Sequence, residues 1–246
     1  MATGLVNPYA VASKNTRYRD AVLADNPMSL WMLDEPYGND VATDQGNSPS
    51  DGTYMGTLST DSTRRGSRTI FGLDAIGNVT NGVGGGQVNC PLNAANEAAI
   101  ESSGGFYDLS FEFLLHLDVL GYDNYPIYSW SPWYISFRST NRLEGRFYSK
   151  TSQNDYAQSP TTIMSAGTDY HCVLGIAGSS SNRSYYWYVN GAMVFSSLLS
   201  GSWGGMLVSP VLQVARFALH GGMAGLAIYD YFLGGYKINA HYNALL

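Results

Sequence analysis

A strand–turn–strand pattern near the C-terminus sets the fold class of this chain. Tyr185 to Val189 is rich in aromatic and β-branched residues, which favour strands. Asn190-Gly191 follows, and this pair is typical of a type I′ turn because both central residues of that turn need a positive φ. Ala192 to Phe195 then returns as a second strand. The sequence therefore predicts a β-hairpin, which belongs in an antiparallel sheet.

The stretch from Tyr107 to Val119 alternates between two kinds of side chain. One face carries Tyr107, Leu109, Phe111, Phe113, Leu115, Leu117 and Val119, and the other carries Asp108, Ser110, Glu112, Leu114, His116 and Asp118. A period of two is typical of a strand that packs one face against a core. We therefore expect the first face to lie between two sheets and the second face to be solvated.

Further strands are expected at short intervals, over residues 29–33, 127–129, 134–138, 143–149, 170–177, 211–218 and 224–231. Glycine, asparagine and serine separate them, which is typical of a sandwich or jelly roll. Helices are expected at 93–100 and at the C-terminus, where Ile238, Tyr242 and Leu245 recur at helical spacing. No linker divides the chain, so residues 18–246 are predicted to form one all-β jelly roll of two antiparallel sheets.

Several motifs, taken in order, resemble laminin-G-like domains, which have the concanavalin A-like jelly-roll fold. They are YRDAVLADNPMSLWMLD at 18–34, DQGNSPSDGTY at 44–54, YVNG at 188–191, and GLAIYDYFL at 225–233 before His241-Tyr242. The chain departs from the family at 71–76, where its motif is degraded to FGLDAI. Domains with this opening and closing are common in structural proteins of tailed bacteriophages. The resemblance therefore implies a non-catalytic virion subunit, such as a minor tail protein, that assembles with other virion proteins in the host cytoplasm.

The composition narrows the choice of partners. Charged residues make up only 13% of the chain, about half the usual ~25%, which suits a virion or extracellular β-protein. The formal net charge is −6, and no concentrated basic patch is visible, so we expect no nucleic acid partner. No apolar run approaches the ~20 residues that span a bilayer, and residues 1–20 contain no apolar signal-peptide core.

Residues 1–17 are expected to form a polar arm that lies against a neighbouring subunit. A segment this polar buries too little apolar surface to order itself alone. The arm residues expected to bind the partner are Leu5, Val6, Tyr9 and Val11 through apolar contacts, and Lys14 and Arg17 through acidic groups. The sequence therefore predicts an oligomeric assembly.

The chain lacks the carboxylate pattern of a glycosidase. Retaining glucanases with related folds carry E-x-D-x-x-E on one strand, and no such string is present. Glu112 and Asp118 are six residues apart, about 20 Å along a strand, whereas glycosidase carboxyl pairs lie roughly 5 to 9.5 Å apart. Glu112 and His116 are about 13 Å apart on the same basis. The four histidines include no pair at a metal-ligand spacing, so we expect no catalytic residues.

Two smaller features concern cofactors and cysteine chemistry. Asp44, Asn47 and Asp51 form an oxygen-rich loop of the kind that binds calcium. The alternative is an Asx-turn loop in which these side chains cap their own backbone, and no other cofactor is expected.

Cys90 and Cys172 are too far apart in sequence for a local zinc site. Cys172 is expected to be a buried thiol, and a disulfide between the two stays open.

The segment GYDNYPIYSWSPWY, at 121–134, concentrates aromatic residues beside polar ones. Flat aromatic faces stack on sugar rings, while Asp and Asn side chains bind hydroxyl groups. The candidate contacts are Tyr122, Asp123, Asn124, Tyr125, Trp130, Trp133, Tyr134 and, in a separate loop, Trp203. The same residues also suit a protein interface. The functional hypotheses are therefore a virion subunit that contacts host-surface glycans, a stand-alone lectin, and a polysaccharide-degrading enzyme.

Overall fold

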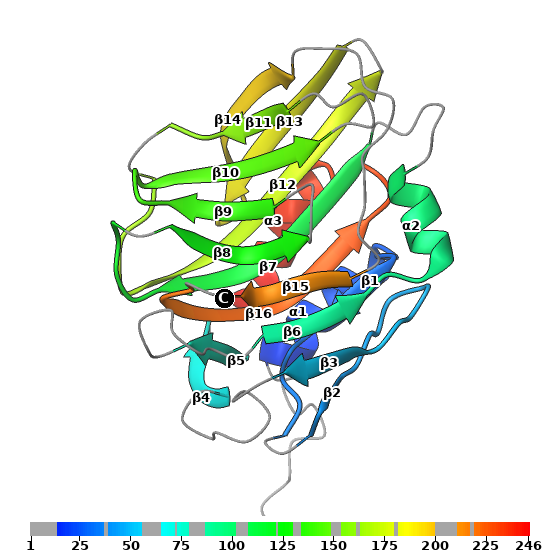
Figure 1. Ribbon diagram of the computed structural model, residues 1–246, viewed down its shortest axis with the longest axis vertical. Coiled ribbons are helices and arrows are strands. Elements are labelled where there is room, and N and C mark those ends of the chain that lie inside the picture. The colour runs from blue at the N-terminus through cyan, green and yellow to red at the C-terminus, as the bar shows by residue number, and fades with distance from the viewer. Residues whose placement is uncertain are drawn as a thin grey trace, which may run out of the picture.

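The chain folds into two antiparallel sheets that pack as a sandwich (Figure 1). The computed structural model describes residues 14–36, 39–55, 65–71, 73–78, 87–101, 108–121, 123–129, 134–148, 154–160, 163–179, 182–199, 211–216 and 219–246 of the 246. Every strand pairing among these residues is antiparallel. The predicted all-β jelly-roll sandwich is confirmed.

The first sheet, called sheet A, has the strand order β14-β13-β12-β7-β16-β5-β4, and β1 also pairs with β16. Its strands are β1 (Ser29–Trp31), β4 (Arg65–Ile70), β5 (Leu73–Asn78), β7 (Leu109–Leu117), β12 (Thr168–Ser179), β13 (Asn182–Val189), β14 (Ala192–Leu199) and β16 (Gly221–Tyr229). The alternating strand of the sequence, β7, lies at the centre between β12 and β16. Both of its edges are therefore hydrogen-bonded to neighbouring strands.

The second sheet, called sheet B, has the order β11-β10-β9-β8-β15-β6-β3-β2. Its strands are β2 (Val41–Ala42), β3 (Gly52–Met55), β6 (Gln87–Pro91), β8 (Asn124–Ser129), β9 (Tyr134–Arg138), β10 (Arg142–Tyr148), β11 (Asn154–Gln158) and β15 (Val211–Arg216). Strands β8 to β11 follow one another both in the chain and in the sheet. This meander places residues 124–129, 134–138, 142–148 and 154–158 side by side at one end of sheet B.

The main core lies between the two sheets. Phe111 and Phe113 of β7, Phe137 of β9 and Trp187 of β13 are fully buried there. The indole Nε1 of Trp187 donates a hydrogen bond of 2.9 Å to the carbonyl oxygen of Ala157, so the polar atom of this large buried side chain is satisfied. The predicted apolar face is thus confirmed from Leu109 to Leu117. Val119 is exposed, which contradicts the prediction there, and Tyr107 lies outside the described residues.

The two cysteines belong to the same core as free, buried thiols. Burial raises the pKa of both Cys90 and Cys172, which keeps each of them protonated and poorly reactive. The structure therefore contains no bridge between them.

A second apolar core lies on the outer face of sheet A, under two helices. α1 (Lys14–Ala24) and α3 (Gly235–Leu245) pack against each other and over this face (Figure 1). The cluster includes Tyr18 and Val22 of α1, Leu114 of β7 and Ile238 of α3, all fully buried. The expectation that the second face of β7 is solvated is therefore wrong, because the helices replace water as its neighbour.

Of the three helices found among the described residues, α2 (Ala94–Glu101) and α3 were predicted and α1 was not. Among the described residues, no helix is long and apolar enough to cross a membrane. The predicted boundary between the arm (residues 1–17) and the domain (residues 18–246) falls inside α1, so the last residues of the arm and the first residues of the domain form one helix. Tyr18 is fully buried and Arg17 is half-buried in its own domain. The partner-binding residues Leu5, Val6, Tyr9 and Val11 lie outside the described residues.

The predicted hairpin joins β13 to β14. Asn190 and Gly191 have φ values of 52° and 76°, as a type I′ turn requires, so this prediction is confirmed. The turn is also tied to sheet A, because the side-chain oxygen of Asn190 accepts a 2.9 Å hydrogen bond from the backbone N–H of His171. It lies close to α3, since a Cβ added at Gly191 would meet Asn239 at 3.0 Å and Tyr242 at 3.1 Å.

Candidate functional site on the outer face of sheet B

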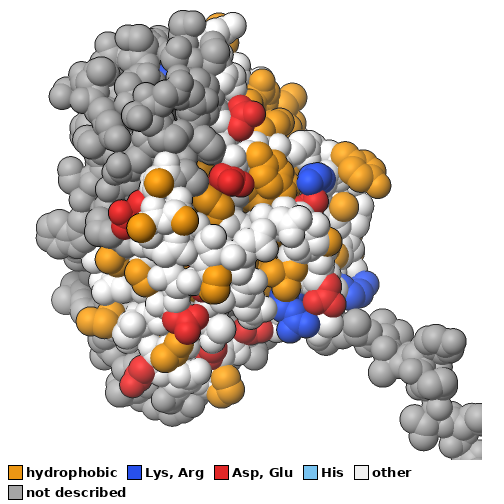
Figure 2. Space-filling model, turned by 90° about the vertical axis from the view of Figure 1, so that its right-hand side faces the viewer, with side chains coloured by type: hydrophobic (Ala, Val, Ile, Leu, Met, Phe, Trp, Pro, Cys, Tyr) orange, Lys and Arg blue, Asp and Glu red, His pale blue; other side chains and the backbone are white. Residues whose placement is uncertain are grey.

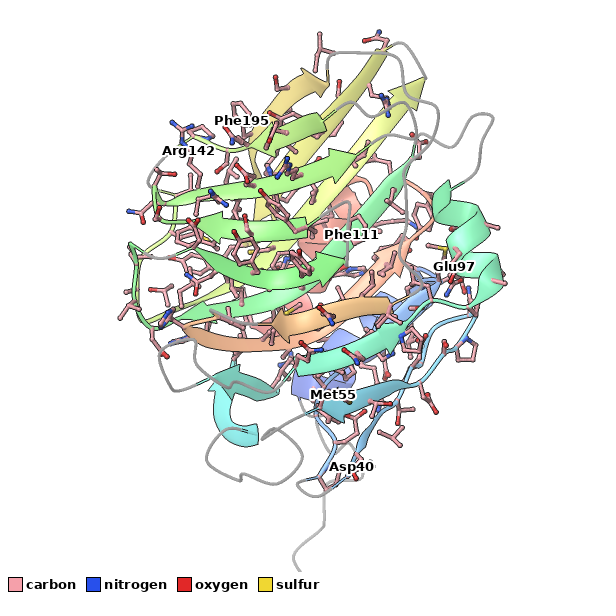
Figure 3. The ribbon with its side chains drawn as sticks, viewed as in Figure 1. Asp40, Met55, Glu97, Phe111, Arg142 and Phe195 are labelled. Carbon is pink, nitrogen blue, oxygen red and sulfur yellow. The ribbon has the colours of Figure 1, made fainter. Side chains whose placement is uncertain are left out.

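The outer face of sheet B is the sheet surface that no described helix covers, because α1 and α3 lie behind sheet A (Figure 1). In the meander β8 to β11, alternate residues such as Ile135, Phe137 and Leu143 point into the main core. Their neighbours Tyr134 and Arg138 therefore point outward. Figure 3 shows how densely side chains line this part of the sheet.

Three tyrosine rings form the centre of this surface. The rings of Tyr128 on β8 and Tyr134 on β9 are stacked, with centroids 6.5 Å apart and planes 5° apart. Tyr125 meets both rings edge-on, at 5.3 Å from Tyr134 and 6.2 Å from Tyr128. All three side chains are half-buried. Their mutual packing fixes the rings, while their outer surfaces remain available to a ligand.

Charged side chains hold the tyrosines in place. Arg138 lies 3.2 Å from the Asp123 carboxylate and 3.8 Å from that of Glu144, and it donates a 3.1 Å hydrogen bond to the Tyr125 hydroxyl. The Tyr134 hydroxyl donates to Glu144 at 2.8 Å. Gln158 of β11 donates to the other oxygen of the same carboxylate. The polar groups beside the rings are thus arranged before any ligand arrives.

The protonation of two of these groups follows from their neighbours. Burial and the hydrogen bond to Glu144 raise the pKa of Tyr134, so its hydroxyl stays a neutral donor at physiological pH. Burial alone lowers the pKa of Arg138, but the charges of Glu144 and Asp123 outweigh it and raise that pKa above its ordinary value. Arg138 is therefore a permanent cation in the site.

A second cation extends the surface toward the edge of the sheet. The guanidinium carbon of Arg146 on β10 lies 5.9 Å from the ring centre of Tyr134 and 5.3 Å from that of Tyr156 on β11. These distances are typical of cation–π contacts. Tyr156 is exposed, with 43% of its surface accessible. The surface therefore contains both aromatic and cationic groups that reach solvent.

The predicted aromatic segment is only partly brought together here. Asp123, Tyr125 and Tyr134 all belong to the surface. Asn124 does not, because it is fully buried and its side-chain oxygen accepts a 2.7 Å hydrogen bond from the backbone N–H of His220. The other candidates, Tyr122, Trp130, Trp133 and Trp203, lie outside the described residues.

Sequence reasoning missed Arg138, Glu144, Arg146 and Tyr156. Arg142, Glu144 and Arg146 do alternate along β10, and that spacing predicts one shared face. The local sequence does not show that β10 pairs with β9 and with β11, and this pairing brings the four residues together.

The predicted calcium loop is held by hydrogen bonds to its own backbone. One carboxylate oxygen of Asp44 accepts from the backbone N–H groups of Leu30 and Gly46, at 2.8 and 2.9 Å, and the other accepts from that of Ser50 at 2.9 Å. Asp51 accepts from the Asp44 N–H at 2.9 Å. The bond from Gly46, two residues on, is the Asx-turn arrangement.

This geometry supports the Asx-turn alternative for Asp44 and Asp51, whereas Asn47 is exposed. Within the described part of the chain, no group of three or more His, Cys, Asp or Glu side chains is placed to hold a metal ion. Calcium binding by Asp44, Asn47 and Asp51 stays a prediction, which melting in the presence of calcium and of a chelator tests.

The largest group of titratable side chains lies inside the molecule, around Glu112. Its carboxylate accepts hydrogen bonds from the hydroxyls of Tyr18 (3.1 Å) and Tyr229 (2.9 Å). It also lies 2.8 Å from Nε2 of His171 and 3.0 Å from Nδ1 of His241. Glu112 was expected on a solvated face, and this is wrong: the residue is fully buried beneath α1 and α3.

Two of these buried groups carry charge. Burial raises the pKa of Glu112, but the charge of His241 and hydrogen bonds from both histidines outweigh it, so its pKa lies well below the ordinary value. Burial lowers the pKa of His241, but Glu112 and Asp25 raise it above its ordinary value. Asp25, just beyond α1, also pairs with Lys237 of α3 at 2.6 Å. Because Glu112, His171 and His241 have almost no exposed surface, this cluster joins elements and has no access to a substrate.

The two antiparallel sheets, one covered by helices and the other open, form a jelly-roll sandwich. A scan against protein-family models finds no match, and a search of curated protein sequences finds none either.

Solved structures with a similar fold include binding domains of botulinum neurotoxins. The botulinum neurotoxin serotype C1 binding domain has a TM-score of 0.67 at 14% identity, over 90% of this chain and 53% of that one. A structure of botulinum neurotoxin type C, a toxin whose cell entry depends upon interaction with two ganglioside molecules, has a TM-score of 0.65 at 14% identity, over 91% of this chain and 52% of that one. The binding domain of botulinum neurotoxin DC in complex with rat synaptotagmin II has 0.64 at 15%, over 90% and 52%. This chain spans about half the length of those proteins, and at such identities the likeness shows the fold alone.

Proposed function

We propose that this protein is a non-catalytic glycan-binding module and that its site is the tyrosine surface of sheet B. The observation that carries the proposal is the stacked pair Tyr128–Tyr134 beside the Arg138–Glu144 pair. Sugar sites combine apolar ring surface with a few fixed polar groups, and this surface supplies both. The half-buried Arg138 can donate hydrogen bonds to sugar hydroxyl groups. The buried carboxylate of Glu144 holds Arg138 and Tyr134 in position.

The similar structures give independent support. They include a botulinum neurotoxin binding domain, and cell entry of botulinum neurotoxin type C depends upon interaction with two ganglioside molecules. The shared fold makes glycan binding a reasonable function for this chain, while the position of the site rests on its own residues.

A glycan array probed with the whole protein tests the proposal. We expect the Tyr134→Ala variant to bind its best glycan about tenfold more weakly, because truncating a central aromatic contact typically costs 1 to 2 kcal/mol. The matched control is Tyr236→Ala on α3, which is 89% exposed on the opposite side of the molecule and should bind normally. Circular dichroism checks that both variants are folded. An array without any bound glycan, or equal binding by Tyr134→Ala, contradicts the proposal.

We further propose that the module is a virion subunit of a tailed bacteriophage and contacts host-surface glycans. The support is the ordered set of motifs shared with laminin-G-like domains, together with the low charged content. Mass spectrometry of purified particles should detect the protein. Deleting residues 2–13 leaves α1 whole, so the variant should fold normally yet fail to enter particles, since the preceding arm is proposed to bind the neighbouring subunit. Normal incorporation of this variant contradicts the proposed role of Leu5, Val6, Tyr9 and Val11.

Two alternatives remain separable by experiment. A stand-alone lectin binds glycans but is missing from particles. A polysaccharide-degrading enzyme releases new reducing ends from host polysaccharide, which a reducing-sugar assay measures directly.

A further inference from the structure

We infer that two copies of this protein associate through β14, whose free edge pairs with β14 of the second copy about a two-fold axis. The partner is therefore a second copy of this chain. This interface is a different surface from the tyrosine surface of sheet B and from the proposed arm contact, so it adds an assembly state to the proposed function.

β14 is the end strand of sheet A, and among the described residues β13 is the one strand that pairs with it (Figure 1). An end strand presents backbone N–H and C=O groups along its outer edge, where they can pair with another chain. β14 is eight residues long, and its sequence, AMVFSSLL, contains no charged residue and no proline. Proteins usually protect a free edge with a short strand, a charge or a proline, and β14 has none of these.

The other three ends of the two sheets are protected against such pairing. β2 has two residues. β4 contains Arg65 and Arg68 and shifts its register between them. β11 has five residues and contains Asp155. A two-fold pairing repeats every charge on both sides of the interface, where like charges destabilise a sheet. Among the described strands at sheet ends, β14 is therefore the one that is both long and free of charge.

Two apolar side chains of β14 face water on the outer face of sheet A. Met193 is 55% exposed and Leu198 is 66% exposed, so α3 leaves both of them uncovered. Met193 is opposite Tyr188 and Leu198 is opposite Ser184, and these partners share one face of β13. Residues five apart in a regular strand point to opposite faces. Here the register shift beside Tyr188 gives β14 one extra residue, which brings both apolar side chains to the same face.

These two side chains lie symmetrically about Ser196. Ser196 is opposite Tyr186, which lies midway along β13 between the partners of Met193 and Leu198. A two-fold axis through Ser196, perpendicular to the sheet, therefore sets Met193 of each copy opposite Leu198 of the other. A two-fold interface requires a surface that is complementary to itself, and β14 has this property.

Charged groups offer little to direct a partner to this protein. Charged residues make up 13% of the chain, and the charged side chains on the face that Figure 2 shows are few and scattered. Backbone hydrogen bonds along a free edge, together with apolar pairs across it, provide an association that does not depend on charge. The net charge of −6 opposes the approach of two copies, and an uncharged strand keeps that repulsion away from the contact.

The first test measures the mass of the whole protein in solution. Sedimentation at increasing concentration should show a dimer with twice the chain mass of 26.7 kDa. Met193→Lys and Leu198→Glu should each weaken the dimer roughly tenfold. The two changes combined in one chain set a lysine opposite a glutamate in both pairs, so the double variant should dimerise more tightly than either single variant. Met55→Lys, at a 43% exposed position on β3, is the control and should leave the dimer unchanged. Melting curves check that every variant is folded.

The second test locates the axis by cross-linking. Opposite residues of an antiparallel pair have Cα atoms about 4.5 to 5.5 Å apart, within the range of about 4.4 to 6.8 Å that a disulfide spans. Ser196→Cys should therefore form a covalent dimer under mild oxidation. Ser197→Cys is the control, because it lies opposite Phe195 of the second copy and should cross-link far less. Cys90 and Cys172 are buried and do not take part.

Each outcome supports or overturns the inference. A parent protein that stays monomeric at its highest soluble concentration overturns it, and so does a dimer that both single variants keep. A double variant that fails to recover, or equal cross-linking at residues 196 and 197, overturns the register. A dimer that is lost only when residues 2–13 are deleted assigns association to the arm. Glycan binding by the single variants tests the proposed function separately, because neither residue belongs to the tyrosine surface.

Discussion

Glu112 is hydrogen-bonded to four side chains that come from four different elements. Tyr18 belongs to α1, His171 to β12, Tyr229 to β16 and His241 to α3. A single carboxylate therefore connects both covering helices to the centre of sheet A. Its fully buried position also means that each of its partners depends on it for a hydrogen bond.

Removing this carboxylate should destabilise the protein as strongly as removing a core phenylalanine. Glu112→Ala leaves two hydroxyls and two histidines buried without their acceptor, and breaking a buried charge pair costs about 3 to 5 kcal/mol. Phe113→Ala, on the other face of β7, should cost about 3 to 5 kcal/mol through the cavity it leaves. Urea unfolding measures both, with Glu112→Gln as the control that keeps size and one acceptor. A loss below about 1 kcal/mol for Glu112→Ala contradicts the role of this network.

Sequence patterns predict features that depend on residues near one another in the chain, and they miss contacts between residues far apart in the chain. Asn190-Gly191 was predicted correctly because its turn follows from local φ preferences. The buried environment of Glu112 was not predicted, because its partner His241 lies 129 residues away in the sequence, on the helix α3 that covers this strand. Similarly, Tyr134 was a candidate from local composition. Tyr156 joins it only through the pairing of β10 with β11, which no local pattern specifies.

At the scale of elements, the β13–β14 hairpin is coupled to helix α3. Gly191→Val should destabilise the protein for two reasons. A β-branched residue resists the φ of 76° found there, and its Cβ would lie 3.0 to 3.2 Å from Asn239 and Tyr242. Thermal unfolding should show a clear loss, while Ser196→Val in the exposed part of β14 serves as the control. Equal melting temperatures for the two variants would refute the coupling.

At the scale of the whole molecule, stability should depend on pH through His241 and Glu112. The pKa of His241 is raised from its ordinary 6.5, so its contribution is complete below pH 6.5 and is lost as the pH rises through the higher folded value. The pKa of Glu112 is lowered from 4.5, so its contribution is complete above pH 4.5 and is lost as the pH falls through the lower folded value. The pair therefore contributes most between about pH 4.5 and 6.5.

The measurement is the difference in free energy of unfolding between the parent protein and His241→Gln across pH. This difference should be largest near pH 5 to 6 and should shrink toward alkaline pH. Tyr236→Ala, a change on the exposed side of the same helix, should give a difference that does not vary with pH. A His241→Gln difference that grows toward alkaline pH would show that the histidine is buried in its neutral form.

The placement of α1 and α3 behind sheet A gives the molecule a front and a back. α1 begins at Lys14 on the back, and the tyrosine surface of sheet B, from Tyr128 to Tyr156, occupies the front. A support that holds the protein from its α1 side turns the front outward. Several copies fixed in this way present their tyrosine surfaces in one direction. Under the proposed glycan-binding function, many weak contacts then act together, and the avidity gives firm attachment without a single tight site.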